Sequence, residues 1–403
     1  MASDLAKVQA IAKRMYSTEA IGEQTRRDHA FQEMLNRKRV FGGEDFRYIV
    51  RYANPQSVSG SFSDAQTQAA GASSKIKQFA TGPALKYCIV QIDGPSLRRL
   101  GGGAQSFINH VTMEFDGALE EIADSIAFDS LGPGFGQRGQ RLSAATDVIT
   151  LVDADSARNF KEGMTVIASA NANGTSPRTG STTVTAVDED LGTITLASAA
   201  AISSFANNDY LFRQGDPGTV VDSLEQIIPL TAPVLGVDSF RGVDRGPDPR
   251  RLAGLRLNDT SLLVEETTGL LAVRAKQGGK KMNCAFWSPT KFHEFTRRMN
   301  AKVEFQSAGG TADYGFEYVM IHTSAGVLKV YSEPDLRPSR VFVGKMSSIE
   351  VRHLMDGLPD WLNDDGLGKT VRMGTADAIE ARIGAQHQLI VTVPGEWGIG
   401  AVG

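Results

Sequence analysis

The pattern that most constrains this sequence is one long amphipathic helix across residues 104–131. Apolar residues recur at helical spacing along one face, and acidic residues occupy the other. Three glycines precede the segment and Gly132-Pro133 follows it, so both ends are marked. At 1.5 Å per residue the helix would be roughly 40 Å long. The apolar residues expected on its buried face are Phe107, Ile108, Val111, Phe115, Leu119, Ile122 and Ile126.

A β-hairpin is predicted ahead of this helix. Apolar and polar residues alternate between Phe46 and Tyr52, as in a strand, and a second strand is expected across residues 76–92. Between them, residues 57–74 are nearly all Ser, Gly, Ala, Gln and Thr, which cannot bury enough apolar surface to offset their ordering entropy. Because an isolated hairpin is only marginally stable in water, we expect this one to lean on another chain.

Residues 142–214 have a different character. Short β runs are separated by Gly, Asn and Asp turns at near-regular spacing, which is typical of a small barrel or sandwich. The segment contains eight acidic and four basic residues, so its excess equals the net charge of −4 of the whole chain. We therefore expect an acidic, solvent-facing β domain inserted into the host domain.

The pattern from residue 222 to about 344 is mixed α/β. A helix is predicted across residues 260–275, followed by a strand in which Met282, Cys284 and Phe286 alternate with other residues. Further along, strict alternation between Ile379 and Val393 predicts a long strand with one buried face.

A strand-to-helix junction follows Phe286. Ser288 is expected to cap a helix whose first turn contains Pro289. The buried stripe of that helix is predicted to be Phe292, Phe295 and Met299.

The first 40 residues have the pattern of a helical arm. They carry eight basic and five acidic residues, and a solvated face is a better interpretation of this mild excess than a nucleic-acid contact. The acidic balance of the whole chain also argues against a protein that grips nucleic acid by counterion release.

Composition excludes several further classes. A chain of 403 residues is too long for one compact core and should form two to four domains. No apolar run approaches the ~20 residues that span a bilayer, and the N-terminus lacks a signal-peptide core. The only cysteines, Cys88 and Cys284, suit a reducing cytoplasm and rule out a disulfide framework.

No residue pattern rises to a catalytic or cofactor site. The segment from Gly366 to Thr370 looks like the end of a phosphate-binding loop, but Asn363 stands where that motif needs its first glycine. The six histidines are scattered and lack the spacing of a zinc site. We therefore expect no enzyme activity, no cofactor and no metal.

The order of parts resembles the major capsid proteins of tailed bacteriophages with the HK97-like fold. The junction at Trp287, Pro289 and Phe292 is similar to a turn in the axial domain of that family, and the β insert resembles outer-face insertions of some members. The resemblance implies an α+β fold with an N-terminal arm, an E-loop hairpin, a spine helix, and peripheral and axial domains. It would divide the chain into an arm (1–40), an E-loop (41–93), a peripheral domain with the spine helix (94–141), the inserted β domain (142–215), an axial domain (216–344) and a return to the peripheral domain (345–403).

The implied function is self-assembly into an icosahedral shell around phage double-stranded DNA, in the virion, after assembly in the host cytoplasm. The implied partners are further copies of the chain in hexamers and pentamers, a separate scaffold protein, a portal, a decoration protein, and DNA through weak non-specific contact, with no membrane. The E-loop residues expected between subunits are Phe46, Tyr48, Tyr52, Phe62, Lys75, Lys77 and Phe79. Lys75 and Lys77 match no cross-linking motif, so ordinary solvated lysines are expected there.

Two alternatives remain open. An encapsulin-like bacterial compartment has the same fold and would package a cargo enzyme, so neighbouring genes would separate it from a phage shell. An unrelated protein whose β insert binds a ligand is the other. The insert holds only four aromatic residues, which disfavours sugar stacking.

Overall fold

The computed structural model describes residues 29–39, 45–69, 71, 73–94, 104–198, 203–298, 318–355, 357–362, 370–374 and 376–403, with backbone alone at 93, 104–113 and 370. The chain forms two compact units, each assembled from three stretches of sequence. Unit 1 comprises Met1–Phe41, Pro83–Ser223 and Arg352–Gln388. Unit 2 comprises Gly42–Gly82, Leu224–Val351 and Leu389–Gly403.

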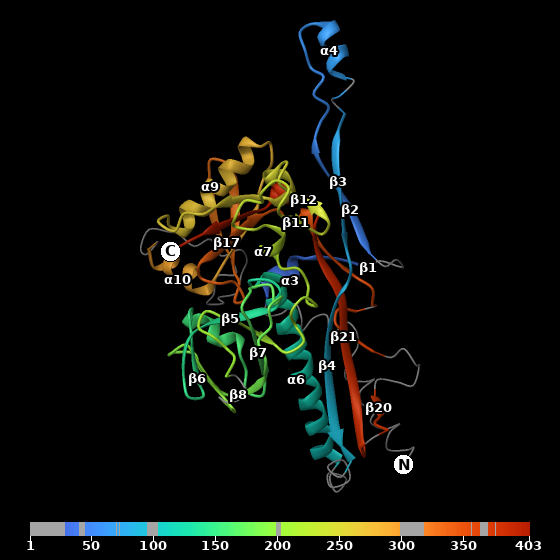
Figure 1. Cartoon of the computed structure of the whole chain (residues 1–403), viewed down its shortest axis with the longest axis vertical. Coiled ribbons are helices and arrows are strands. Elements are labelled where there is room, and N and C mark those ends of the chain that lie inside the picture. The colour runs from blue at the N-terminus through green and yellow to red at the C-terminus, as the bar shows by residue number, and fades with distance from the viewer. Residues whose placement is uncertain are drawn as a thin grey trace, which may run out of the picture. The chain divides into compact units, whose positions relative to one another are not determined.

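Unit 1 contains the long helix packed along a β-sheet. The helix, α6 (Ala104–Leu131), has the predicted bounds, and it packs against β4 (Ala84–Asp93) (Figure 1). β4 pairs antiparallel with the longest strand, β21 (Ala378–Val391), which continues into unit 2. The sheet order is β1-β18-β21-β19, and β20 also pairs with β21. The remaining elements of this part are α3 (Ala30–Met34), β1 (Asn36–Arg39), β18 (Ile349–His353), β19 (Asp360–Trp361) and β20 (Thr370–Arg372).

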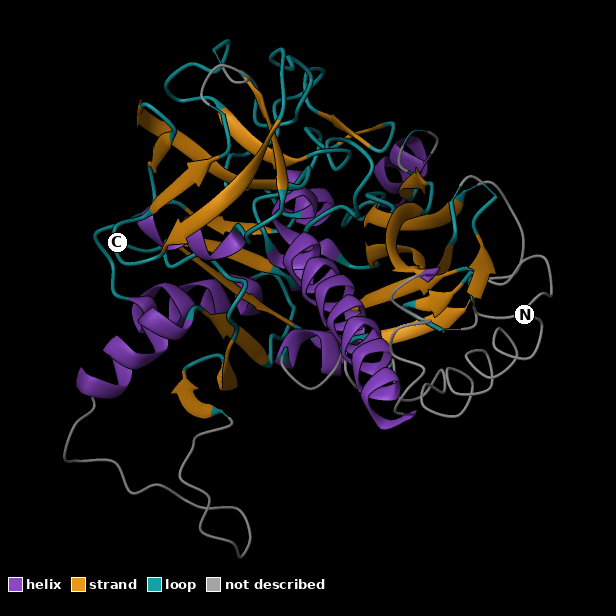
Figure 2. Ribbon diagram, turned by 90° about the horizontal axis from the view of Figure 1, so that it is seen from below, coloured by secondary structure: helices purple, strands orange, loops and turns teal. Residues whose placement is uncertain are grey.

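The β insert of unit 1 is a closed six-stranded barrel in the order β10-β5-β6-β9-β8-β7 (Figure 2). Alternate residues point inward, so the barrel has a core of its own that includes Ile149, Val166, Ile194 and Leu211. A barrel was among the predicted forms, although it begins before the predicted boundary at residue 142. Its elements are β5 (Gln137–Ala145), β6 (Val148–Leu151), the 3₁₀ helix η2 (Ala154–Asn159), β7 (Thr165–Ser169), β8 (Thr182–Asp188), β9 (Thr193–Leu196) and β10 (Tyr210–Arg213).

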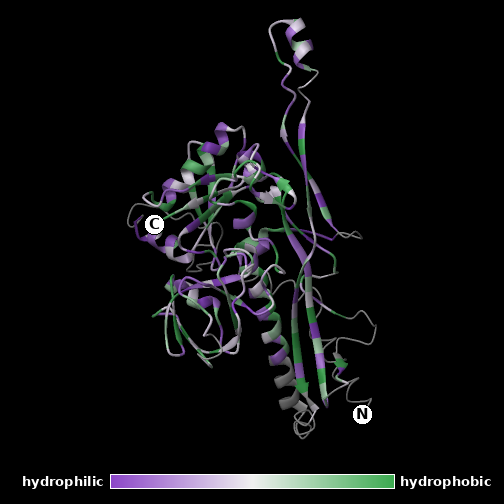
Figure 3. Cartoon of the chain, viewed as in Figure 1, coloured by the Kyte–Doolittle hydropathy of each residue, from purple (hydrophilic) through white to green (hydrophobic). Residues whose placement is uncertain are grey.

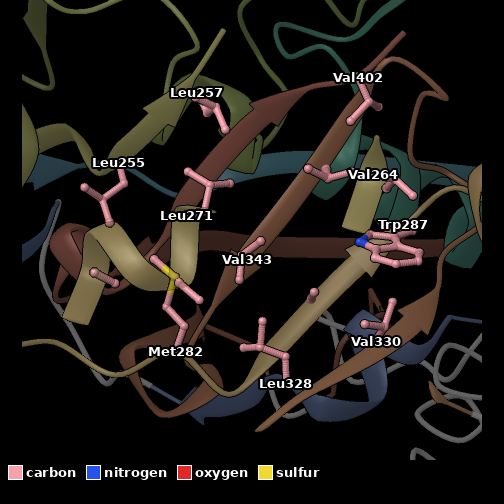
Figure 4. Close-up of a cluster of buried hydrophobic side chains, with 14 of the residues drawn as sticks. Leu255, Leu257, Val264, Leu271, Met282, Trp287, Leu328, Val330, Val343 and Val402 are labelled. Carbon is pink, nitrogen blue, oxygen red and sulfur yellow. The ribbon is translucent and has the colours of Figure 1, made fainter. Parts of the chain in front are cut away.

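Unit 2 is built on a mixed sheet in the order β13-β22-β17-β14-β16-β15. Helix α9 packs against this sheet over a core that contains Trp287, Leu271 and Val343 (Figure 4). Its sheet strands and covering helices are β13 (Leu255–Leu257), α9 (Val264–Gln277), β14 (Cys284–Trp287), α10 (Pro289–Arg298), β15 (Val319–Thr323), β16 (Gly326–Ser332), β17 (Arg340–Gly344) and β22 (Gly398–Ala401). Shorter elements are α7 (Leu224–Ile227), β11 (Ser239–Phe240), β12 (Val243–Asp244), α8 (Pro249–Ala253), and the 3₁₀ helices η4 (Met346–Ser348) and η5 (Pro394–Glu396).

Close packing in unit 2 depends on a glycine. A side chain at Gly344 would fall 2.2 Å from the Trp397 ring, so only glycine lets the indole lie against the strand. The same indole stacks on Phe286 with ring centroids 6.4 Å apart. Since all four residues of β14 are buried, both faces of that strand are covered. The predicted alternation of buried and exposed residues there was therefore wrong.

The predicted hairpin is present in unit 2. Strands β2 (Phe46–Ala53) and β3 (Lys75–Thr81) pair antiparallel. The prediction of one strand across residues 76–92 was wrong, because the chain breaks at Gly82-Pro83 and β4 then joins the sheet of unit 1. Proline lacks the N–H that a continuous ladder would need.

Two further predictions need correction. The arm was expected to be helical to residue 40, but β1 is a strand of the unit 1 sheet, so tertiary pairing overrides the local pattern there. The strand β21 was expected to bury one face, yet every residue from His387 to Val391 is buried. The arm before residue 29 lies outside the described residues. Among the residues described, no helix is long and apolar enough to cross a membrane.

Candidate assembly surfaces

The base of the hairpin is held inside unit 2. Val50 and Phe79 are buried in a cluster with Val243 and Leu252, and the Tyr48 ring stacks on Phe79 at 5.1 Å. Buried side chains cannot also contact a neighbouring subunit.

The assignment of two hairpin residues to an inter-subunit contact is therefore corrected. Phe46 and Phe79 are almost fully buried, so their physical role is to fix the hairpin to its own chain. Tyr48 and Tyr52 are half-buried against the cluster and stay open to the predicted contact. Lys75 is exposed and Lys77 is half-buried, which leaves them open to the predicted role.

The hairpin tip has no packing of its own. It contains helix α4 (Phe62–Ala69), which the polar composition did not predict, and no residue of α4 is buried. Val58 and Phe62 are 90% and 84% exposed, the largest exposures among the large apolar side chains described. Phe62, Ala65 and Ala69 lie at i, i+3 and i+7, so they share one helix face. We call Val58 together with this face the tip patch.

A second apolar surface lies on unit 1. Leu85, Tyr87 and Ile89 alternate along β4 and are 43%, 53% and 54% exposed. The intervening Lys86 points the opposite way, toward Asp129 of α6, so α6 covers only one face of β4. Most residues of β4 are apolar, and Figure 3 colours the chain by hydropathy. We call Leu85, Tyr87 and Ile89 the β4 stripe.

The spine-helix residues divide by position. The side chains of Phe115, Leu119 and Ile122 are buried, and Phe115 meets Trp361 edge-on at 5.6 Å. The side chains of Phe107 and Val111 lie outside the described residues, although both belong to α6.

Four buried charges join the barrel to the helix and sheet. The Lys86 Nζ lies 2.9 Å from Asp129 Oδ2 and 3.1 Å from Asp216 Oδ1. The guanidinium of Arg138 completes the cluster, with Nη2 3.7 Å from Asp216 Oδ2. Arg138 lies on β5, and Asp216 follows β10, so both ends of the barrel are fixed at one point. No local sequence pattern predicts this cluster, because its members are far apart in the chain.

Burial shifts the pKa values of two groups in this region, Asp216 and His387. It raises the pKa of Asp216, although Lys86 and Arg138 act in the opposite sense. The His387 ring is fully buried, and burial lowers its pKa to about 4. Asp129 raises the pKa of His387, while Arg37, Lys86 and His353 lower it.

An open groove of about 590 Å³ is lined by Glu121 of α6 and by residues of the barrel domain. Lys161 crosses it, with Nζ 2.8 Å from Glu121 Oε2 and 3.0 Å from Asp124 Oδ2. Burial opposes the ionisation of Glu121, but hydrogen bonds from Lys161 and Arg213 hold its pKa below the usual value. The lining charges neutralise one another, so the groove offers little net charge to a ligand.

The predicted axial-domain junction is structural. Ser288 accepts a hydrogen bond from the Lys291 backbone N–H at 3.3 Å, and Pro289 begins α10, which confirms the predicted cap. Trp287 is fully buried and donates to Thr268 Oγ1 at 3.0 Å. Phe292 is half-buried against the same core. In the predicted buried stripe Phe295 is buried, while Met299 lies outside the described residues.

The segment that looks like the end of a phosphate-binding loop is followed by a strand. Residues 363–369 lie outside the described residues, and β20 begins at Thr370. A nucleotide-binding loop of this type would be followed by a helix.

Sequence comparison and structure comparison give different outcomes. No protein-family model matches the chain, and no curated protein matches it in sequence. Its structure is similar to a subunit of the cyanophage A-1(L) capsid, with a TM-score of 0.52, 10% identity and 92% of both chains covered.

Two further structures match with lower scores. The capsid of a native GTA particle gives a TM-score of 0.44 at 9% identity, covering 94% of this chain and 90% of that one. A chain of Mycobacterium phage Ogopogo gives 0.42 at 9% identity, covering 93% and 92%. The fold assignment rests on the cyanophage subunit. This chain has the HK97-like fold of phage capsid proteins.

Proposed function

We propose that this chain is the major capsid protein of a tailed bacteriophage, which assembles with copies of itself into a closed shell around double-stranded DNA. The observation that carries the proposal is the hairpin: its base is anchored in its own chain, but its tip buries nothing there. The match to a phage capsid subunit over 92% of both chains supports the same function.

The physical reason is the cost of ordering the tip. An eight-residue helix is not stable alone in water, and exposed Val58 and Phe62 add an unfavourable contact with solvent. A neighbouring copy removes both costs when it covers the tip. Repeated head-to-tail contacts of this kind close into rings when their rotation closes, which is how hexamers and pentamers form.

The hairpin acts in this proposal as a lap joint over the adjacent subunit. The outer face of its strands exposes Ile49 and Ile76, at 62% and 58%, together with Arg51. These residues and the two lysines, Lys75 and Lys77, are the candidates for contact along the shaft of the hairpin. The acidic barrel faces solvent on the outer surface and offers the place for a decoration protein.

Further partners complete the proposal. A separate scaffold protein guides assembly, a portal occupies one vertex, and DNA is held by weak non-specific contact. The protein is located in the virion after assembly in the host cytoplasm.

The test is direct. The purified chain, alone and co-expressed with the scaffold protein of its own genome, is examined by sedimentation and negative-stain electron microscopy. We expect closed particles of megadalton mass in at least one preparation. A monodisperse monomer in both would overturn the proposal.

A further inference from the structure

One end of unit 2 carries a dense group of cations. Helix α9 ends at Gln277, and the exposed segment 278–281 then leads toward β14. Five basic side chains at this end of the unit are exposed, and a sixth is half-buried. We call these six residues the basic patch: Arg250, Arg274, Lys276, Lys280, Lys281 and Lys345.

The basic patch runs across one end of the sheet, where β13, β22, β14 and β16 begin and β17 and β15 end. Arg250 precedes β13 at one edge of the sheet. In the middle, Lys280 precedes β14 and Lys345 follows β17. At the other edge, Lys276 Nζ donates to the Ser324 carbonyl, in the turn between β15 and β16, at 2.7 Å. Since neighbouring strands lie about 4.8 Å apart, the six strands spread these cations over about 24 Å.

Few carboxylates compensate this charge. Lys280 Nζ and Lys345 Nζ each lie 3.9 Å from Glu396 Oε1. In the part of the chain that the structure describes, no other carboxylate forms an ion pair with a member of the basic patch. Arg274 and Lys276 lie in the last turn of α9, where cations stabilise the end of a helix, but this role does not explain the other four.

The net charge of the whole chain does not report this local excess. The acidic excess of residues 142–214 equals the net charge of −4, so the rest of the chain is balanced overall. The acidic composition therefore argues against strong binding of nucleic acid by the chain as a whole, but it is compatible with one local contact.

We propose that the basic patch binds the phosphate backbone of nucleic acid, which is double-stranded DNA in the assembled shell. This inference rests on the proposed function and assigns the weak DNA contact to named residues. B-DNA carries one negative charge per about 1.7 Å of its axis, so an elongated band of cations matches an elongated polyanion. Four of the six residues are lysines, whose charges lie at the ends of flexible stems. Contacts with phosphate alone carry no sequence information, so the binding is non-specific.

Salt-dependent binding of a short labelled DNA duplex to unassembled subunits tests the proposal by fluorescence anisotropy. Lys280→Ala with Lys281→Ala removes two exposed charges and should leave the circular dichroism spectrum unchanged. The affinity at about 0.1 M NaCl should fall about ten-fold or more, and the slope of log K against log salt should shrink by about two, because each lost phosphate contact removes about one. Lys280→Arg with Lys281→Arg should keep the original affinity and slope.

A matched control removes the same charge elsewhere in unit 2. Arg297 and Arg298 are exposed on α10, and Arg298 pairs with Glu265 in the first turn of α9, at the opposite end of that helix from the basic patch. Arg297→Ala with Arg298→Ala should lower the affinity by less than about two-fold, because charges more than about 10 Å away are screened. Equal losses from the two double alanine variants would overturn the inference, since only general attraction to DNA would remain.

A polyglutamate peptide distinguishes an acidic protein partner from nucleic acid. We expect the duplex to bind more tightly than a peptide of equal charge. A peptide that binds at least as tightly, and loses as much affinity in the double alanine variant, would overturn the assignment to nucleic acid. Closed particles from a chain whose subunits bind no duplex would also contradict the inference and leave the proposed function standing. The absence of any particles would contradict the proposed function instead.

Discussion

The barrel inserted in unit 1 and the hairpin tip of unit 2 are stabilised in opposite ways. The barrel closes on itself and buries its own core, in which Ile194 and Leu211 are fully buried. The hairpin tip has regular structure but no buried residue. A closed sheet removes its own edges and apolar surface, whereas a projecting hairpin leaves both exposed. The barrel is complete as a single chain, and the tip requires another.

Removing the tip should have the largest effect on assembly. Deletion of residues 57–74 leaves residues 54–56 as the connection, a length that suits a hairpin loop. We expect a folded protein by circular dichroism that forms only capsomers or unstable shells, because every subunit loses the same contact. Normal, heat-resistant particles would show that the tip is a passive loop while leaving the capsid function intact.

A cavity in the barrel core should lower the stability of the single subunit, and this loss should not depend on contacts with neighbouring subunits. Ile194→Ala removes a fully buried side chain from the barrel core and should lower the free energy of unfolding by about 2–5 kcal/mol. Chemical denaturation of unassembled subunits measures the loss. A change of less than about 0.5 kcal/mol would mean that the barrel core does not contribute as its burial indicates.

Lowering the pH should reduce the stability of unit 1, because the folded chain resists protonation of the buried His387. Its pKa is about 4 in the folded chain and about 6.5 when unfolded, so only the unfolded chain binds the proton between these values. Stability should therefore fall as the pH drops from 6.5 toward 4, by about 3 kcal/mol in total. Denaturation curves at a series of pH values, compared with His387→Gln, isolate this contribution. An unchanged pH slope in the variant would assign the acid sensitivity to other groups.

Truncation in the tip should have the smallest effect on the isolated subunit. Phe62→Ala removes an aromatic ring that touches little in its own chain, so the free energy of unfolding should change by less than about 0.5 kcal/mol. The same substitution should reduce particle yield, whereas Gln68→Ala on another face of α4 should not. A large loss of stability in the monomer would show that the tip packs internally.

The contrast also explains which features could be predicted from the sequence. The bounds of α6 were predictable because glycines and a proline mark both ends of a strong 3.6-residue period. The barrel was predictable from regular turns. Helix α4 was missed because Ser, Asp, Gln and Thr dominate it, although Ser61 followed by Asp64 resembles the start of a capping box.

Features that depend on distant residues were beyond the sequence. The buried cluster of Lys86, Asp129, Arg138 and Asp216 joins four segments, and single charged residues look the same whether buried or exposed. The burial of Val50 and Phe79 likewise depends on Val243 and Leu252, and a local sequence pattern cannot predict contacts with such distant residues. Alternation predicted the hairpin strands but not which of their faces the chain itself would cover.

Hydrogen exchange on subunits before and after assembly tests the central claim most directly. The backbone amides of α4 should exchange almost freely in the unassembled subunit and become protected in the shell, because only a neighbour stabilises them. Amides of barrel strands such as β6 and β9 should be protected in both states, since the barrel core is complete in one chain. Equal protection of α4 before and after assembly would contradict the account.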